Sequence, residues 1–267
     1  MAIVNYERDG NVAIISMNRP EKLNALSKAL NDGLEEAWEK FEHDDKVKVG
    51  ILRGEGESFC AGADLVEFKE HPPGSSIPDP DRERYRRPWA LSKPLICAAQ
   101  GWSVGAGSIL MVSCDLVIAA ESLKIWYSEM IRGLTPIAAK YIVNQIPLLF
   151  INQLVYEAEP IDAQTALRMG FVNRVVPDDK LMDAAMRSAR RIASMPIHGL
   201  VLYKKFVRKA VELPDTAYYQ ISLNRALSAG HQDVAIAGLE AWAERKQFSD
   251  GGGAEYPLPE EFNRTEV

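Results

Sequence analysis

The feature that most restricts how this chain folds is a pair of turns rich in small residues, at positions 58–65 and 100–108. Each turn follows a predicted strand and opens a predicted helix. Glycine lets the backbone approach a ligand closely, and the first N–H groups of a helix have no partner within it. Two such groups aimed at one point would form an oxyanion hole. Similar turns also serve simple packing of a helix on a sheet, so the turns alone leave both interpretations open.

Hydrophobic patterning around these turns predicts an α/β fold. Short β-rich runs alternate with helical patterns. The runs lie at 12–17, 47–52, 94–99 and 116–119. The clearest helix has Ser27 in the N-cap position and apolar residues along one face. Those apolar residues are Leu30, Leu34, Trp38 and Phe41.

The second half of the chain is predicted to be mostly helical. Asp162 is expected to cap a helix that ends at Gly170. Further helices are predicted over 178–194, 200–211, 217–228 and 234–246. Alternating strands and helices followed by a helical tail predict an α/β core over 1–195. A C-terminal helical capping region with a flexible tail is predicted over 196–267.

Composition excludes several classes of protein. The chain has 267 residues, 47% of them hydrophobic, which is enough for one large core without metal or disulfide support. Its three cysteines and four histidines show no metal-ligand spacing, so we expect no metal site. No apolar run is long enough to span a membrane, and no secretion signal is visible, so we expect a cytoplasmic protein. The net charge of −6 disfavours nucleic acid as a partner.

One segment stands apart from this pattern. Residues 69–90 contain five prolines and a cluster of charged side chains. The composition indicates a variable loop or loop–helix insert. Its arginines could reach phosphate groups, although such charge runs are usually solvated surface.

Five stretches resemble, in the right order, the signatures of the crotonase (enoyl-CoA hydratase/isomerase) family. Two of these signatures are the turns themselves, with FCAGADL at 59–65 and a longer motif at 93–107. The other three are NRP followed by NALS at 18–27, SCD at 113–115, and a helix-and-strand pattern at 161–176. The resemblance implies a crotonase-like ββα spiral core with a C-terminal helical region. It also implies an acyl-CoA substrate, no cofactor beyond the CoA of that substrate, and a homotrimer or hexamer.

The resemblance also implies which residues form the site. Backbone N–H groups of Ala63 and Ala106 would hold the thioester oxygen. Ala106 replaces the middle glycine of the family motif, and it can still donate its backbone N–H. The expected substrate-binding residues are Ala61, Gly62, Asp64, Leu65, Gly105, Ile109, Trp102, Trp126 and Tyr127. Trp126 is interpreted as a wall of the acyl pocket because the family usually has a small residue there.

Catalytic carboxylates decide the predicted reaction. Family hydratases carry two glutamates, and here the first position is Ile109 while the second is Glu129. A single carboxylate suits removal of a proton from one carbon and its return to another. The first interpretation is therefore isomerisation of a 3-enoyl-CoA to a 2-enoyl-CoA with Glu129 as acid and base. Apolar and aromatic neighbours of Glu129 would raise its pKa toward a useful range.

Three alternatives remain open at this stage. The chain could be an enoyl-CoA or cyclic dienoyl-CoA hydratase in which Ser108, Tyr127 or Glu67 helps to activate water. Other chemistry of the family, such as thioester hydrolysis, could use the same oxyanion hole. The chain could also be a non-catalytic paralogue that binds acyl-CoA or RNA, and its acidic charge disfavours RNA.

Overall fold

The structure is a computed structural model, and it describes residues 2–64, 67, 87–128 and 146–212. It divides into two compact units, residues 1–189 and 190–267. Each unit is described by itself below. The predicted boundary at residue 195 remains a prediction.

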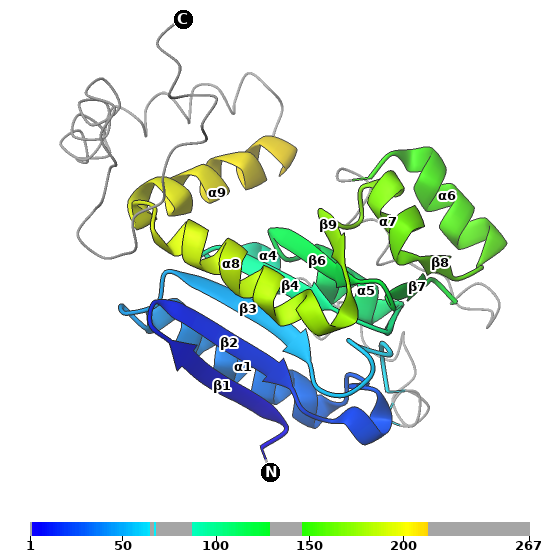
Figure 1. Cartoon of the computed structure of the whole chain (residues 1–267), viewed down its shortest axis with the longest axis horizontal. Helices are drawn as coiled ribbons and strands as arrows, with labels where there is room; N and C mark the ends of the chain where they lie inside the picture. Colours follow the sequence, from blue (N-terminus) through cyan, green and yellow to red (C-terminus); the bar gives the residue numbers. More distant parts are fainter. Residues whose placement is uncertain (1, 65–66, 68–86, 129–145, 213–267) are drawn as a thin grey trace, which may run out of the picture. The chain divides into compact units, whose positions relative to one another are not determined.

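A six-stranded mixed sheet forms the centre of the first unit (Figure 1). Its strand order is β1-β2-β3-β4-β6-β9, in which β1 runs antiparallel to β2 and the other pairs are parallel. The strands are β1 (Val4–Asp9), β2 (Val12–Met17), β3 (Val49–Gly54), β4 (Leu95–Ala99), β6 (Leu116–Ala120) and β9 (Arg174–Val176). The predicted strands at 12–17, 94–99 and 116–119 are confirmed, and that at 47–52 is displaced by two residues.

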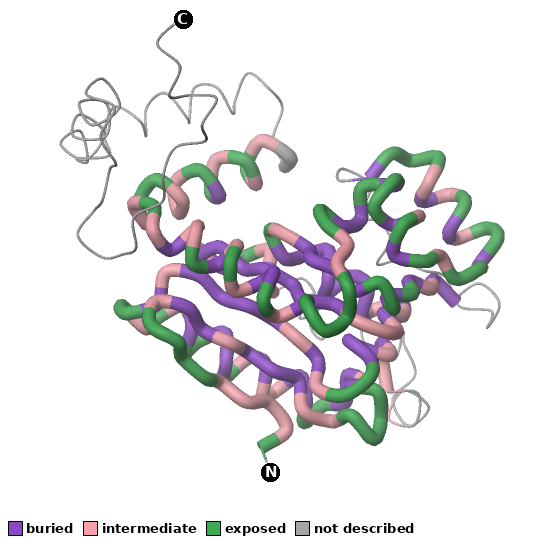
Figure 2. The backbone as a smooth tube through the Cα atoms, viewed as in Figure 1, coloured by how far each residue is buried: buried purple, intermediate pink, exposed green. Residues whose placement is uncertain are grey.

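Burial explains why these strands read as continuous apolar runs. β4 is buried at every position, and β3 at all but one. Parallel strands covered on both faces lack the polar alternation of a half-exposed sheet. The buried parts of the backbone follow these central strands (Figure 2).

Helix α1 (Lys28–His43) covers β1 and β2 on one side of the sheet. Ser27 caps it as predicted, because its side-chain oxygen accepts a hydrogen bond from the Leu30 N–H at 3.2 Å. The predicted apolar face is buried in the core. At the other end, the Lys93 ammonium donates to the carbonyls of Phe41 and Asp44 at 2.9 and 2.7 Å. Both ends of α1 therefore have side-chain partners.

A second sheet of very short strands was not predicted from the sequence. It has the order β5-β7-β8, formed by Trp102–Val104, Lys124–Trp126 and Ile161–Asp162. β5 and β7 are parallel, and β8 is antiparallel to β7. Helix α5 (Ala106–Val112) follows β5 directly and contacts β4, β5 and β6. This small sheet therefore places the second glycine turn beside the main sheet.

The short helices η1 (Pro20–Lys22) and α4 (Arg87–Ala90) lie in the first half of the chain. The helices described after residue 146 agree with the predicted helical second half. They are α6 (Leu148–Glu157), α7 (Ala163–Met169), η4 (Asp178–Lys180), α8 (Leu181–Ala193) and α9 (Ile197–Glu212). Asp162 and Gly170 cap α7 as predicted. In the second unit, α9 confirms the helix predicted at 200–211. The helices predicted at 217–228 and 234–246, and most of the 69–90 insert, lie outside the described residues.

Candidate active site

The two glycine turns lie side by side although they are far apart in the sequence. The Cys60 N–H donates to the Trp102 carbonyl at 3.0 Å, and the Val104 N–H donates to the Cys60 carbonyl at 2.9 Å. Cys60 and Ser103 thus form a parallel bridge. The segment around Cys60 extends the small sheet by one more strand-like stretch next to β5.

Gly62 shows how closely the two turns approach. Its φ is +85°, a conformation that glycine adopts without steric cost. A Cβ at this position would lie 2.5 Å from the Val104 carbonyl oxygen and 3.6 Å from the Ala106 nitrogen. The backbone just before Ala63 is therefore next to the first N–H of α5.

The hydrogen bonds around Ala63 are made by the residues on either side of it. Leu26 forms a parallel bridge with Ala63, in which the Leu26 N–H donates to the Gly62 carbonyl at 2.7 Å and the Asp64 N–H donates to the Leu26 carbonyl at 3.3 Å. In such a bridge the groups of the central residue point away from the partner. Among the described residues, the Ala63 N–H has no hydrogen-bond acceptor.

Ala106 begins α5, and its N–H is likewise unengaged within the described part of the chain. Gly105 precedes it with φ +48° and ψ −114° and donates its own N–H to the Trp126 carbonyl at 2.9 Å. The positive φ requires glycine at this turn. The structure therefore places in neighbouring turns the N–H groups of Ala63 and Ala106, neither of which has an acceptor in the part of the chain that the structure describes.

The two α5 side chains that follow the Ala106 turn and bear on the reaction, Ser108 and Ile109, are respectively hydrogen-bonded and apolar. Ile109 is fully buried in the hydrophobic core. The Ser108 hydroxyl donates to the Ser103 carbonyl at 2.8 Å, and both serines are fully buried. The Ser108 hydroxyl hydrogen is therefore bound to the protein backbone.

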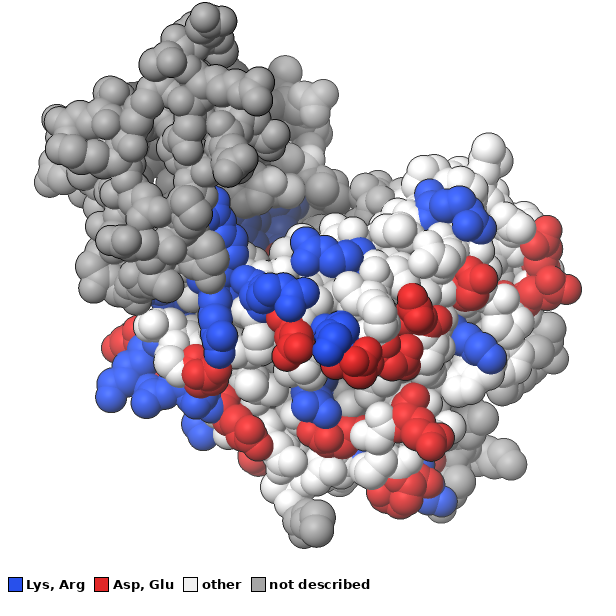
Figure 3. All heavy atoms as spheres, in the orientation of Figure 1, with Lys and Arg blue, Asp and Glu red and all other residues white. Residues whose placement is uncertain are grey.

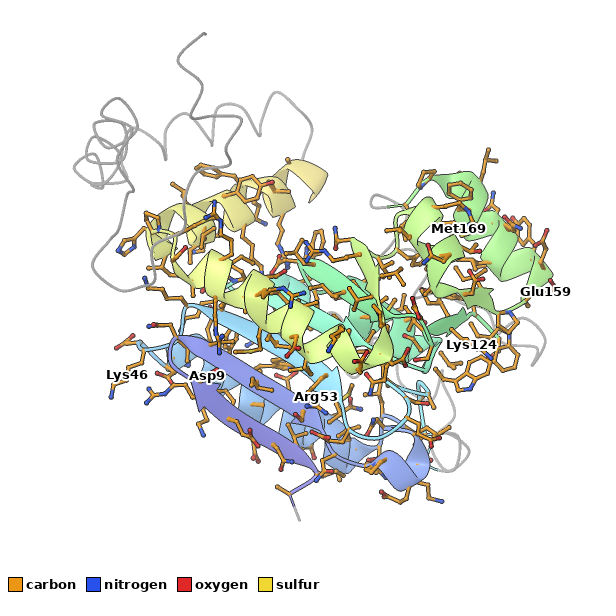
Figure 4. All side chains as sticks on the ribbon, viewed as in Figure 1. Asp9, Lys46, Arg53, Lys124, Glu159 and Met169 are labelled. Atoms are coloured by element: carbon orange, nitrogen blue, oxygen red, sulfur yellow. The ribbon has the colours of Figure 1, made fainter. Side chains whose placement is uncertain are left out.

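An aromatic pair lies on the small sheet. The ring centroids of Trp102 and Trp126 are 6.1 Å apart, and both residues are half-buried. The indole N–H of Trp126 donates to the Ala158 carbonyl at 2.7 Å, which fixes that ring toward the end of α6. Lys124 (labelled in Figure 4) places its ammonium 5.3 Å from the centre of the Trp102 ring. Tyr127, which follows Trp126 in the sequence, is buried.

Four more residues that the sequence analysis named are bound elsewhere or lie outside the described residues. A Glu67 carboxylate oxygen accepts a hydrogen bond from the Lys28 N–H at 2.7 Å, so it binds the first turn of α1. The Asp64 carboxylate is paired with Arg19 at 2.7 Å. Glu129 and Leu65 lie outside the described residues.

Comparison with known proteins decides the family. The family model described as "Enoyl-CoA hydratase/isomerase" matches residues 7–251. The chain belongs to this family.

Individual relatives are similar across most of the chain. "Enoyl-CoA hydratase EchA19" of Mycobacterium tuberculosis is 31% identical over 247 residues, covering 90% of this chain and 93% of the relative. The "1,2-epoxyphenylacetyl-CoA isomerase" of Escherichia coli is 34% identical over 218 residues, covering 74% and 79%. The crystal structure of an enoyl-CoA hydratase from Bacillus anthracis superposes with a TM-score of 0.84 at 27% identity, covering 94% and 100%. The crotonase fold is confirmed, and the chain is a hydratase or isomerase of the crotonase family that acts on acyl-CoA.

The cysteines of this family member behave as packing residues. Cys60, Cys97 and Cys114 are all free and buried. Burial raises the pKa of the Cys60 thiol to about 12, and burial together with the neighbouring Cys114 raises the pKa of Cys97 well above its usual range. Thiols held in the protonated form are poor nucleophiles. The Cys60 thiol donates to the Asn24 carbonyl at 3.2 Å instead.

Other kinds of site find no support in the described residues. In these ranges no group of three His, Cys, Asp or Glu side chains could hold a metal ion. None of the helices described is long and apolar enough to cross a membrane. Lysine and arginine are interspersed with aspartate and glutamate on the face shown in Figure 3.

Proposed function

We propose that this chain binds the thioester oxygen of an acyl-CoA between the N–H groups of Ala63 and Ala106, and that it hydrates a 2-enoyl-CoA. The observation that carries this proposal is the pair of donors in neighbouring turns, for which the described ranges contain no acceptor. Addition to C3 puts negative charge on the thioester oxygen as an enolate forms. One such donor lowers the barrier by about 3–4 kcal/mol.

Glu129 is the acid and base of the proposed reaction. It accepts a proton from water as the water oxygen bonds to C3, and the double-bond electrons move onto the thioester oxygen. The enolate then collapses, and C2 takes the proton from Glu129. One molecule of water is added, and the carboxylate is restored.

The names of the relatives favour hydration over the isomerisation that the sequence suggested first. The relatives include several hydratases in addition to the isomerase of Escherichia coli. We therefore rank hydration first and carry the identity of the reaction as part of the proposal.

Isomerisation is the second candidate, and Ile109 is the observation that favours it. This side chain is fully buried and apolar at the position where family hydratases carry their first glutamate. In that reaction Glu129 removes a proton from C2 of a 3-enoyl-CoA and returns it to C4. The enolate between the two steps uses the same two N–H donors.

The contacts of Ser108 and Glu67 argue against their taking part in water activation. Ser108 donates to a backbone carbonyl, and Glu67 caps a helix. The proposal assigns the acid–base work to Glu129 alone.

The acyl group is proposed to lie against Trp126. A bulky indole in place of a small residue shortens or reshapes the pocket, and the bond to Ala158 holds the ring in place.

We also propose the homotrimer or hexamer that is usual in the family. No cofactor beyond the CoA of the substrate is required.

Labelled water separates the two reactions. The protein is incubated with crotonyl-CoA, and separately with a 3-enoyl-CoA, in heavy water that also carries ¹⁸O. Hydration gives a product with ¹⁸O on C3 and one deuterium on C2. Isomerisation gives a shifted double bond and no ¹⁸O, with deuterium only to the extent that the proton on Glu129 exchanges with solvent before it reaches C4. No change in either substrate, together with retained binding to CoA, would support the binding-only paralogue.

A further inference from the structure

The loop before α1 holds the segment that carries the Ala63 donor. The Ala61 N–H donates to the Leu23 carbonyl at 2.9 Å. Leu26 then bonds to both neighbours of Ala63 through its N–H and its carbonyl. The backbone on either side of Ala63 is thus tied to residues 23–26.

This loop is itself strained. Leu23 and Asn24 have φ values of +49° and +54°, which non-glycine residues rarely adopt. The Asn24 side chain is fully buried, and its amide donates to the carbonyls of Glu55 and Ser58, both at 2.9 Å. Its side-chain oxygen accepts from the Arg19 N–H at 2.9 Å. Strain that is held by several side-chain bonds is often found where a site must be fixed in advance.

Arg19 closes the same loop through its side chain. One nitrogen of its guanidinium, Nη1, contacts the Ala25 carbonyl at 3.1 Å and the Asp64 carboxylate at 2.7 Å. The Arg19 and Asp64 side chains are only 20% and 11% exposed. Charge-assisted bonds are strong and directional, and partial burial reduces their screening by water. Arg19 thus joins residue 25 to residue 64 on the far side of Ala63.

From these contacts we infer that Arg19 is a positioning residue for the reaction. Its bonds to Ala25 and Asp64 fix the direction in which the Ala63 N–H points. Arg19 does not touch the reacting atoms in this role; it acts through Asp64 and the backbone. The inference rests on the proposed function, because it gives that N–H the thioester oxygen as its target.

The test compares the wild type with Arg19→Gln, using acetoacetyl-CoA and CoA as probes. Acetoacetyl-CoA ionises to an enolate whose ultraviolet absorbance reports how well its oxygen is stabilised. We expect Arg19→Gln to raise the pKa of bound acetoacetyl-CoA by about one unit, which is a tenfold loss of enolate stabilisation. We expect kcat to fall by about 10- to 100-fold, as for a small misplacement of a catalytic group. Affinity for CoA, which has no thioester carbonyl, should stay unchanged.

Two further variants make the result specific. Arg19→Lys keeps a positive charge beside Asp64 and should recover part of kcat. Arg53→Gln is the matched control, because Arg53 and Glu55 form a comparable ion pair at 3.0 Å with side chains 29% and 33% exposed. Arg53 lies on β3 (Figure 4), and among the described residues its side chain forms no hydrogen bond or ion pair with residues 60–64. Its loss should change neither kcat nor the pKa of the bound probe.

A purely structural role would give a different pattern. Arg19→Gln would then unfold at a lower temperature, while kcat and the probe pKa, measured where the variant is folded, would match the wild type. That result overturns the inference. If Arg19→Gln does not fold, the same measurements on Asp64→Asn decide, and wild-type values there overturn it as well.

Failure of the proposed function would look different again. In that case the wild type itself would not bind acetoacetyl-CoA or would not stabilise its enolate. The positioning role of Arg19 would then fall together with the proposed function. If the wild type and Arg19→Gln stabilise the enolate of the bound probe equally, only the positioning role is overturned.

Discussion

Gly62 lies so close to Val104 that a Cβ on Gly62 would come within 2.5 Å of the Val104 carbonyl oxygen. We therefore expect Gly62→Ala to lower the free energy of unfolding by about 3 kcal/mol, from positive-φ strain and from overpacking. The turn would shift, and kcat should fall because the Ala63 and Ala106 donors separate. Denaturant unfolding and steady-state kinetics measure the two effects.

Gly170 supplies the control for this substitution. Its φ of +86° matches that of Gly62, but nothing lies within 4 Å of a Cβ built there. Gly170→Ala should cost only the strain of the left-handed conformation, about 1–2 kcal/mol, and should leave kcat unchanged. Equal effects of the two substitutions on kcat would contradict the importance of the close approach.

Glu129→Gln should abolish turnover and keep binding of CoA. The amide is nearly isosteric with the carboxylate but cannot accept and return a proton. Single-turnover kinetics and equilibrium binding of CoA on the same preparation separate these effects. Wild-type turnover in this variant would sink the single-carboxylate mechanism.

Ser108→Ala tests whether the serine takes part in water activation. Its hydroxyl donates to the buried Ser103 carbonyl, so its removal leaves that acceptor one bond short. We expect a loss of about 1–2 kcal/mol in unfolding free energy and no change in kcat. A large fall in kcat without loss of stability would return Ser108 to the list of catalytic groups.

Much of the fold could be predicted from the sequence because the sequence signals for these strands and helix caps are local. The strands β2, β4 and β6 are long apolar runs, and the caps Ser27 and Asp162 act within one helical turn. The small sheet escaped prediction because its strands are only two or three residues long, too short to show a period. β1 escaped as well, and it is a half-exposed edge strand with polar residues at its end.

The candidate site could be predicted only in part from the sequence, because its parts come from distant positions on the chain. The sequence indicated two turns, but their pairing through Cys60 and Ser103 joins residues far apart on the chain. The Arg19–Asp64 pair spans 45 positions in the same way. Both residues stood in motifs, yet only the fold shows that they meet.

The buried thiol of Cys60 makes stability depend on pH. Its pKa is about 12 in the folded protein, raised by burial from a usual value of 9.0. Since the folded pKa is the higher one, the contribution to stability is complete below pH 9.0 and is lost as pH rises toward about 12. Each unit of pKa difference corresponds to about 1.4 kcal/mol. We expect Cys60→Ala to show a shallower loss of unfolding free energy than the wild type between these pH values, measured by urea denaturation. Parallel pH profiles for the two proteins would show that this thiol is not protected from ionisation by the fold.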